Sequence, residues 1–361
     1  MALQYVLLPI LAQVFGLNYA QVGLLRAVSS TVMSVLEIPA GVMAERFGEP
    51  VLLVFGLVCA SAGYLSVALA NDFELIVFGF FIAGVGAAFQ HSLASALITG
   101  NFDSANHRRA LGVYNSSGDL GKLGFTGVFS LGLGLGLAWN ASVVFLCLLT
   151  LIFAASIPAL TKTAQRTKTH HQAEGGKPGW GIKKPNEFIW LSITVFLDSM
   201  MQAVFLTFIA FVLLDKGVGE GLASIAVVLA LSGGMVGKFC CGFLAARFGD
   251  RKTFLLLQVL SVAGLLLLTV LPAMLTLIFL PLLGLAVQGT STVTYGSVSE
   301  FIDSNRQSRG YALIYTLANA SSVVGPFIFG FIADQQGLDL SLIVLALITS
   351  VTFFSSFVLR R

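Results

Sequence analysis

Charged residues are scarce in this chain. Asp, Glu, Lys and Arg together make up 10% of its 361 residues, whereas about 25% is usual in soluble domains. Hydrophobic residues make up 57%, and the mean hydropathy is +0.91. So little charge does not suit a surface that faces water. The composition therefore argues against soluble enzymes and nucleic-acid-binding proteins, and it predicts an integral membrane protein.

Cysteine and histidine are also few. Cys59, Cys147, Cys240 and Cys241 all lie in apolar runs, and neither a Cys-x-x-Cys pair nor clustered histidines accompany them. We therefore expect neither a disulfide nor a metal site. The sequence also lacks the G-x-x-x-x-G-K-S/T loop that binds nucleotide phosphates. These absences predict a protein without a cofactor and without catalytic chemistry, so it is not expected to be an enzyme.

Apolar runs of about 20 residues, the length that crosses a bilayer as a helix, fill most of the chain. They lack the alternation of barrel strands, so an all-α membrane fold is predicted. The predicted helices cover approximately residues 19–43, 51–70, 73–99, 109–135, 137–159, 188–214, 221–246, 252–271, 274–300, 309–333 and 338–359. Residues 1–14 are apolar but too short to span. We interpret them as an incomplete first helix, left by a start codon placed too far downstream or by trimming, which brings the total to twelve.

One polar segment divides these helices into two groups. Residues 161–187 are rich in Lys, Thr and Gly and contain Pro178 and Pro185, a composition typical of a linker. We therefore predict an N-terminal six-helix bundle in residues 1–160, with its first helix incomplete, and a C-terminal six-helix bundle in residues 188–361. Basic residues gather in the linker and in alternate loops, so the positive-inside rule places the linker and the C-terminus in the cytoplasm.

A short sequence occurs twice in the chain. GVMAERFGEP begins at Gly41, and GFLAARFGDRK begins at Gly242. Further downstream and at the same separation, Arg108 corresponds to Arg309. A match that keeps its spacing across several predicted helices indicates an internal duplication.

Both copies resemble the signature turn of the major facilitator superfamily, G-x-L-A-D-R-x-G-R-K, which joins helices 2 and 3 and again helices 8 and 9. The likeness in helix count, linker and repeat covers the whole chain. It implies a twelve-helix fold of two bundles around a central cavity that opens to either side in turn. Glu45 stands where the family has Asp, and Ala246 replaces the acid of the second copy. The resemblance implies a gating role for Gly41, Glu45, Arg46, Gly242, Arg247 and Arg251.

A second likeness is to efflux carriers. The segment AFQHSLAS in helix 73–99, followed by Arg109 and a Tyr-Asn-x-x-Gly helix, is similar to the fosmidomycin-resistance type. Helix 109–135 has glycines of the drug-antiporter signature, with Phe125 in place of its proline. The resemblance implies proton-coupled export of a drug or metabolite across a bacterial inner membrane. The alternatives are an importer of an organic anion or zwitterion, by symport or uniport, and a non-transporting sensor or scaffold. The expected partners are a small-molecule substrate, a proton and lipid, with no nucleic acid and no second subunit.

Charges inside the predicted spans each cost about 2.5 to 3.5 kcal/mol, so they are expected to be paired, hydrated or functional. Polar residues recur at helical spacing in helices 19–43, 109–135 and 274–300, and we expect these three stripes to line one cavity. The candidate substrate and coupling residues are Arg26, Glu37, Gln90, His91, Asn115, Asp119, Lys122, Asp198, Gln202, Lys238, Gln288 and Tyr295.

Asp119 and Lys238 have opposite charge and similar predicted depth, each about 15 Å from a cytoplasmic arginine by helix rise. They are predicted to pair between the two bundles; in the alternative, Asp119 pairs with Lys122 one turn away. Two interpretations also stay open for Arg26, which either contacts substrate or extends to the membrane interface. His91 serves either proton coupling or packing.

Overall fold

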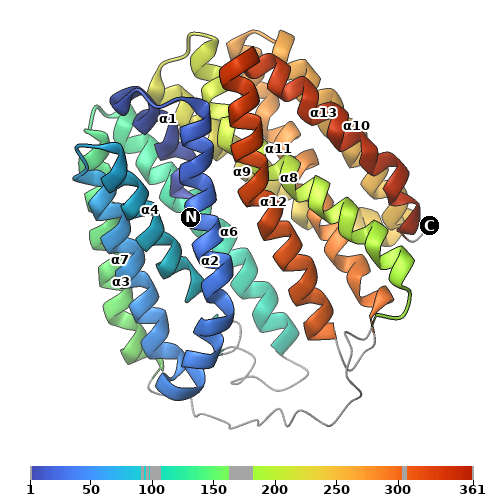
Figure 1. The fold of residues 1–361 in the computed structure, drawn as a ribbon, viewed down its shortest axis with the longest axis horizontal. Coiled ribbons are helices and arrows are strands. Elements are labelled where there is room, and N and C mark those ends of the chain that lie inside the picture. Colours follow the sequence, from blue (N-terminus) through green and yellow to red (C-terminus); the bar gives the residue numbers. More distant parts are fainter. Residues whose placement is uncertain are drawn as a thin grey trace. The chain divides into compact units, whose positions relative to one another are not determined.

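The computed structural model describes residues 2–90, 93–94, 97, 107–161, 182–302 and 307–359. These residues form twelve α-helices and two short 3-10 helices, which confirms the all-α fold (Figure 1). The helices are α1 (Leu3–Phe15), α2 (Tyr19–Phe47), α3 (Glu49–Ala68), α4 (Phe73–Ala88), α6 (His107–Gly134), α7 (Trp139–Thr161), α8 (Pro185–Asp215), α9 (Glu220–Phe248), α10 (Asp250–Val270), α11 (Ala273–Ser297), η1 (Val298–Phe301), α12 (Gln307–Gln336), α13 (Leu338–Ser355) and η3 (Ser356–Val358).

Eight of these helices, α3 and α7 to α13, are long and apolar enough to cross a membrane, while α1 and α4 are apolar but shorter. Their large apolar side chains do not all turn inward. Phe239 is 71% exposed, Ile278 76% and Phe354 80%. Exposed apolar surface of this extent suits contact with lipid rather than water. The protein is therefore a multi-pass integral membrane protein.

The chain divides into two compact units. Unit one comprises Met1–Leu3 and Val28–Lys177, and unit two comprises Gln4–Ala27 and Pro178–Arg361. Helix α2 belongs to both, because its residues up to Ala27 fall in unit two and the rest fall in unit one. A single continuous helix therefore connects the units, in addition to the chain between α7 and α8.

Within unit one, α3 lies between α4 and α7 (Figure 1). Glycines let α3 and α4 approach so closely that their backbones touch. A Cβ atom added at Gly63 would overlap the backbone of Gly79, and one added at Gly86 would overlap that of Gly56. On each helix the two glycines are spaced about two turns apart. We call this contact the glycine seam; it is the kind of small-residue packing that holds helices together in lipid.

The glycine seam supplies a test of stability. Gly63→Ala is expected to destabilise the protein by about 1 to 3 kcal/mol, because the added methyl group meets backbone that cannot move aside. Gly127→Ala is the matched control, since a Cβ at that position meets nothing within 4 Å. Thermal unfolding in detergent should show a lower midpoint for Gly63→Ala alone. Equal midpoints for the two variants would show that the seam tolerates side chains.

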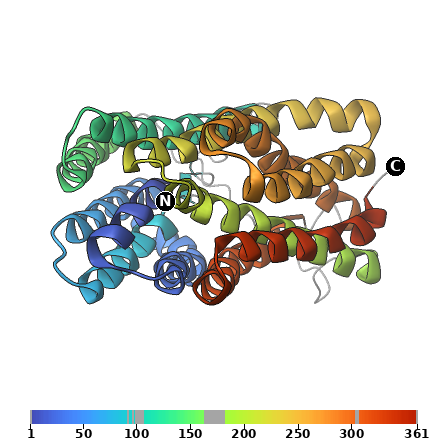
Figure 2. The ribbon, with the colours of Figure 1, turned by 90° about the horizontal axis from the view of Figure 1, so that it is seen from above.

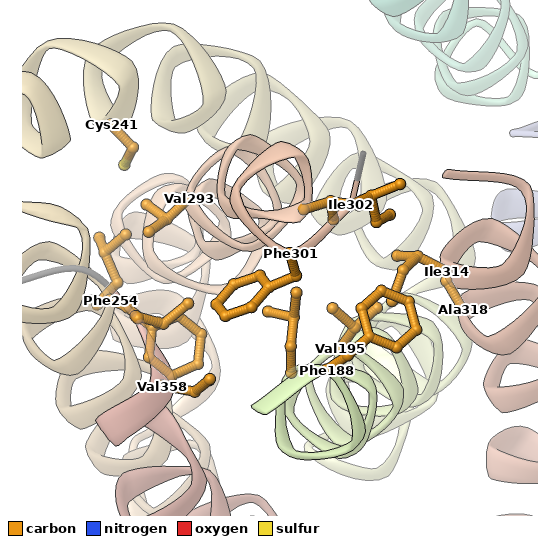
Figure 3. Close-up of a cluster of buried hydrophobic side chains, with 14 residues drawn as sticks. Phe188, Val195, Cys241, Phe254, Val293, Phe301, Ile302, Ile314, Ala318 and Val358 are labelled. Atoms are coloured by element: carbon orange, nitrogen blue, oxygen red, sulfur yellow. The ribbon is translucent and has the colours of Figure 1, made fainter. Parts of the chain in front are cut away.

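Unit two is built around α8, which lies alongside α12 and α13 (Figure 2), and around the closely packed pair α9 and α11. A buried apolar cluster joins these helices at the end where α8 begins. In it, Phe301 of η1 lies between Phe254 of α10 and Phe188 of α8 (Figure 3). The residues before α8 are attached to the same cluster: Ile182 packs against it, and the Lys183 N–H donates to the Phe301 carbonyl at 2.9 Å.

The predicted helix over residues 73–99 is wrong in its continuity, because α4 ends at Ala88 and residues 89–90 form a turn, whereas residues 93, 94 and 97 are again helical. The Phe89 N–H then donates to the carbonyl of Gly86, three residues back rather than four. Such tightening is common where an α-helix ends. Gly84 and Gly86 in the last turn also weaken the helix there.

Helix α8 starts earlier than predicted. It begins at Pro185, whereas the predicted helix covers 188–214, so the last residues of the predicted linker, 161–187, are helical. Proline suits the first turn of a helix, because its fixed φ is already helical and the N–H that it lacks would have had no partner there.

The duplication is visible in the backbone itself. Six glycines have positive φ angles, a conformation that other residues rarely adopt. They form three pairs, Gly16 with Gly217, Gly48 with Gly249, and Gly136 with Gly337. Each pair has the same separation as the two copies of the repeated turn. The described residues therefore place the same chain reversals at the same points of both copies.

Candidate functional site

The two signature turns fold alike. Helix α2 ends at Phe47 and helix α9 ends at Phe248, and a glycine with φ 84° or 86° follows each. In both turns an exposed arginine lies over the ring of the next residue: Arg46 is 5.5 Å from the Phe47 ring centre, and Arg247 is 5.4 Å from that of Phe248. The turns of Gly41 and Gly242 thus share one geometry.

The gating role of these turns stays a prediction. The side chain of Glu45, the acid on which that role depends, lies outside the described residues, and Arg251 lies in the first turn of α10. Acids begin both following helices, Glu49 on α3 and Asp250 on α10. These carboxylates stabilise the positive ends of their helices.

Asp198 is the most deeply buried of the candidate charges. It lies on α8, about 20 Å along the helix from Pro185 by helix rise, and is 1% exposed. One carboxylate oxygen, Oδ2, accepts hydrogen bonds from Gln202 Nε2 at 2.9 Å and from Thr290 Oγ1 at 3.0 Å. The other oxygen, Oδ1, is buried and has no hydrogen-bond partner among the described residues.

The two carboxylate oxygens of Asp198 have different surroundings, since only Oδ2 accepts hydrogen bonds from the described residues. An ionised carboxylate offers about four acceptor positions, and leaving a charged group partly unsatisfied away from water is costly. A proton on Oδ1 removes the charge and still leaves Oδ2 to accept both donors. The geometry therefore suits a carboxyl group that gains and loses one proton at Oδ1. Thr290 has one hydroxyl hydrogen for two acceptors, Asp198 Oδ2 and the Val287 carbonyl at 2.9 Å, so it can turn away when Asp198 is neutral.

Arg26 is buried rather than extended toward the membrane surface. It is 8% exposed, and its guanidinium donates from Nη1 to Gln4 Oε1 at 3.1 Å and from Nη2 to the Tyr5 hydroxyl at 2.8 Å. The guanidinium also lies 4.9 Å from the centre of the Tyr5 ring. Residues of α1 therefore hold a positive charge inside unit two.

Two further candidates lie on α11. Gln288 is 6% exposed and donates from Nε2 to the Ala230 carbonyl of α9 at 3.3 Å. It also fills the space beside Gly234, so it packs α11 against α9. The Tyr295 ring lies 5.0 Å from the ring of Tyr315 on α12. These contacts fix both side chains within unit two.

The ion pair between Asp119 and Lys122 is present on α6, with Lys122 Nζ 2.7 Å from Asp119 Oδ1. Asp119 belongs to unit one, whereas Lys238, on α9, belongs to unit two. The pairing of Asp119 with Lys238 therefore stays a prediction.

The remaining candidates lie in unit one. Gln90 donates from Nε2 to the Leu53 carbonyl of α3 at 3.0 Å, and Glu37 is half-buried on α2. His91 lies outside the described residues, as does the side chain of Asn115. Their predicted roles stay predictions.

Sequence reasoning missed the partners of both buried charges. Thr290, Gln4 and Tyr5 are neutral residues in apolar helices, where hydroxyl and amide groups are common. A partial signal existed for Thr290, because it lies two residues after Gln288 in the polar half of α11. Among the described residues no group of three or more His, Cys, Asp or Glu is arranged to hold a metal ion.

The chain resembles known transporters along its whole length. The family model described as Major Facilitator Superfamily matches residues 1–236 and 191–361. A hexuronate transporter of Bacillus subtilis is 23% identical over 91% of this chain and 83% of its own length. The class H tetracycline resistance protein of Pasteurella multocida is also 23% identical, over 86% of this chain and 78% of its own length.

Solved structures share the fold. A bacterial homologue of the human lysosomal transporter Spinster, in an inward-facing and unoccupied conformation, has a TM-score of 0.79 at 15% identity, over 99% of this chain and 95% of its own. The nucleoside transporter NupG has a TM-score of 0.78 at 12% identity, over 99% and 94% of the two chains. At these identities the similarity supports the twelve-helix fold predicted from the sequence.

Proposed function

Because the chain belongs to the major facilitator superfamily, we propose that it is a proton-coupled secondary transporter that carries a small organic anion through the membrane by alternating access. Family and fold are those of a transporter rather than of an enzyme. The coupling ion and the substrate class are the parts of the proposal that family membership alone does not supply.

The observation that carries the proposal is Asp198. It lies near the middle of a membrane-spanning helix, is buried, and has one oxygen without a partner among the described residues. Ionisable groups at such depth are expensive and are typical of proton pathways in transporters. Protonation that alternates with exposure to the two sides couples the movement of substrate to the proton gradient.

The anionic substrate is supported by charge. Arg26 presents a buried guanidinium, the group best suited to bind carboxylates through paired hydrogen bonds. Two of its hydrogen-bond partners, Gln4 and Tyr5, are neutral. A hexuronate, the substrate in the name of one relative, is an anion of this kind.

A second candidate is proton-coupled export of a drug. The tetracycline resistance protein among the relatives favours it, as does the resemblance to efflux carriers. In this case Asp198 takes up a proton as the drug leaves and releases that proton on the other side as the next drug molecule binds, and Arg26 serves structure rather than substrate binding. A sensor or scaffold that moves nothing is the third possibility.

Flux into proteoliposomes distinguishes the three functions. Purified protein is reconstituted, a pH gradient is imposed in either direction, and the uptake of hexuronate, other carboxylates and tetracycline is followed. We expect saturable uptake of an anion that reverses when the pH gradient is reversed. Drug flux without anion flux would replace the proposal with export. Absence of flux for every compound, from protein that remains folded, would favour the scaffold.

A further inference from the structure

The first turn of α2 is capped by a carboxylate from a distant part of the chain. The N–H of Tyr19 donates to Asp334 Oδ1 at 2.7 Å, and the N–H of Ala20 donates to Asp334 Oδ2 at 2.8 Å. The first N–H groups of a helix have no partner within it, and an anion is favoured at this positive end. Asp334, near the end of α12, thus satisfies two such groups at once.

Next to this cap the two helix backbones meet. A Cβ atom added at Gly23 would overlap the carbonyl group of Pro326, and one added at Gly330 would overlap that of Tyr19. Tyr19 meets Gly330, whereas Gly23, later on α2, meets Pro326, earlier on α12. The two helices therefore run antiparallel here. Glycine at both positions permits the approach, and any other residue would hold the helices apart.

A third helix takes part through aromatic rings. The Tyr19 ring meets Phe208 of α8 edge-on with centres 6.1 Å apart, and meets Phe211 in the same way at 5.5 Å. Edge-to-face contacts of this kind add to the stability that burial provides. We call the set of Tyr19, Gly23, Pro326, Gly330 and Asp334, with these two rings, the α2–α12 clasp.

The start of α2 has a neutral cap of its own, since Asn18 Oδ1 accepts from the Gln21 N–H at 2.8 Å, and Asp334 adds the negative charge. The first turn of α2 contains no acid of its own, as is also true of α1, α6, α7, α11 and α12, whereas α3, α4, α8, α9, α10 and α13 each contain one. At the separation of the internal repeat, Tyr19 corresponds to Glu220, and Asp334 corresponds to Leu133. The second copy therefore has the acid on the helix itself, and the first copy has it on a different helix.

The clasp lies at the end of α2 opposite the signature turn. Helix α2 has 29 residues from Tyr19 to Phe47, a length of about 43 Å. Since the positive-inside rule predicts a cytoplasmic signature turn, the clasp falls on the other side of the membrane. Beyond Ala27 the same helix belongs to unit one, so α2 is shared by the two units.

We propose that the α2–α12 clasp is a reversible latch that holds the non-cytoplasmic side closed, and that it opens when the transporter exposes its site to that side. When α2 leaves α12, water replaces Asp334 on the helix end and hydrates the carboxylate, so opening carries a modest cost. This inference requires only alternating access and does not depend on the coupling ion or on the substrate.

The test follows the distance between the end of α12 and the end of α1, which a short turn joins to the start of α2. Spin labels are placed at two exposed positions, Gln13→Cys at the end of α1 and Gln335→Cys at the end of α12, after the native cysteines have been replaced by serine. Pulsed electron resonance gives the distribution of distances in lipid. Asp334→Ala removes both acceptors, and since each charged hydrogen bond contributes about 1.5 to 3 kcal/mol, we expect the population at longer distance to rise about tenfold or more.

Matched variants separate the latch from general damage. Asp339→Ala removes an exposed acid from the neighbouring α13 and should leave the distances unchanged. Gly330→Ala should open the latch by contact with Tyr19, whereas Gly221→Ala, where the added atom meets open space, should not. If Asp334→Ala fails to fold, Asp334→Asn, which keeps one acceptor, should give an intermediate shift. Distances that remain those of the parent in the folded Asp334 and Gly330 variants would overturn the proposal.

Discussion

Asp198→Asn is expected to remove the coupling of transport to the proton gradient while leaving exchange of substrate intact. The amide oxygen of asparagine can accept the same two hydrogen bonds from Gln202 and Thr290 that Asp198 Oδ2 accepts. Its amide nitrogen takes the place of Oδ1, so the variant imitates the protonated state permanently. A side chain that cannot release its proton stays in the same state on both sides of the membrane, so it cannot couple transport to the proton gradient.

The expected loss is large. One pH unit is equivalent to a tenfold concentration ratio, about 1.4 kcal/mol, so a gradient of about two units supports roughly hundredfold accumulation at one proton per substrate. Asp198→Asn should reduce this ratio to about one, measured as steady-state uptake in proteoliposomes. Glu187→Gln, which neutralises an exposed acid in the first turn of α8, should accumulate substrate like the parent. Accumulation of substrate by the Asp198→Asn variant would show that another residue carries the coupling proton.

Arg26→Gln is expected to weaken binding of the anionic substrate by about tenfold to a hundredfold. Hydrogen bonds from a charged donor contribute about 1.5 to 3 kcal/mol each, and glutamine retains neither the charge nor the paired geometry. The affinity of Arg26→Lys for the anion should lie between those of the parent and Arg26→Gln, because lysine keeps the charge but not the planar pair of donors. The half-saturation concentration for the anion identified in the flux panel, with hexuronate tested first, provides the measurement.

Arg26 also joins α2 to α1, so a control must separate substrate binding from structure. Tyr5→Phe removes the hydroxyl that accepts from Arg26 while it keeps the ring beneath the guanidinium. It should lower thermal stability slightly and leave the half-saturation concentration within about twofold of the parent. Unchanged affinity for the anion in folded Arg26→Gln would assign Arg26 to structure alone and would favour the export of a drug.

The features that the sequence predicted well are those set by neighbouring residues. The apolar runs predicted the helices correctly, because length and hydropathy alone decide which segments lie in lipid. The two turns at Gly48 and Gly249 are confirmed with nearly equal φ angles, since a glycine next to a helix end specifies its own conformation. Asp198 was identified because a carboxylate in an apolar run is conspicuous.

What the sequence did not predict depends on residues far apart in the chain. Asp334 is followed by two glutamines at the end of α12, and nothing in that segment distinguishes it from an ordinary solvated helix end. Its role becomes visible only once Tyr19 lies beside it. Likewise, the single hydroxyl hydrogen of Thr290 can go either to Asp198 or to a backbone carbonyl of its own helix, so its sequence context looks self-sufficient. The early end of α4 was missed because apolar residues such as Phe89, Leu93 and Leu97 continue beyond it.

The glycine seam has a consequence for how the protein is made. Its two contacts, Gly63 with Gly79 and Gly56 with Gly86, lie progressively farther from the short turn between α3 and α4. Contacts between residues so near in sequence close quickly, because only a short loop has to be ordered. The two helices can therefore pack against each other as a hairpin, starting at the turn, while the ribosome is still synthesising the rest of the chain. Insertion of this pair into the bilayer then needs nothing from unit two, which gives the nascent protein a rigid element against which later helices assemble.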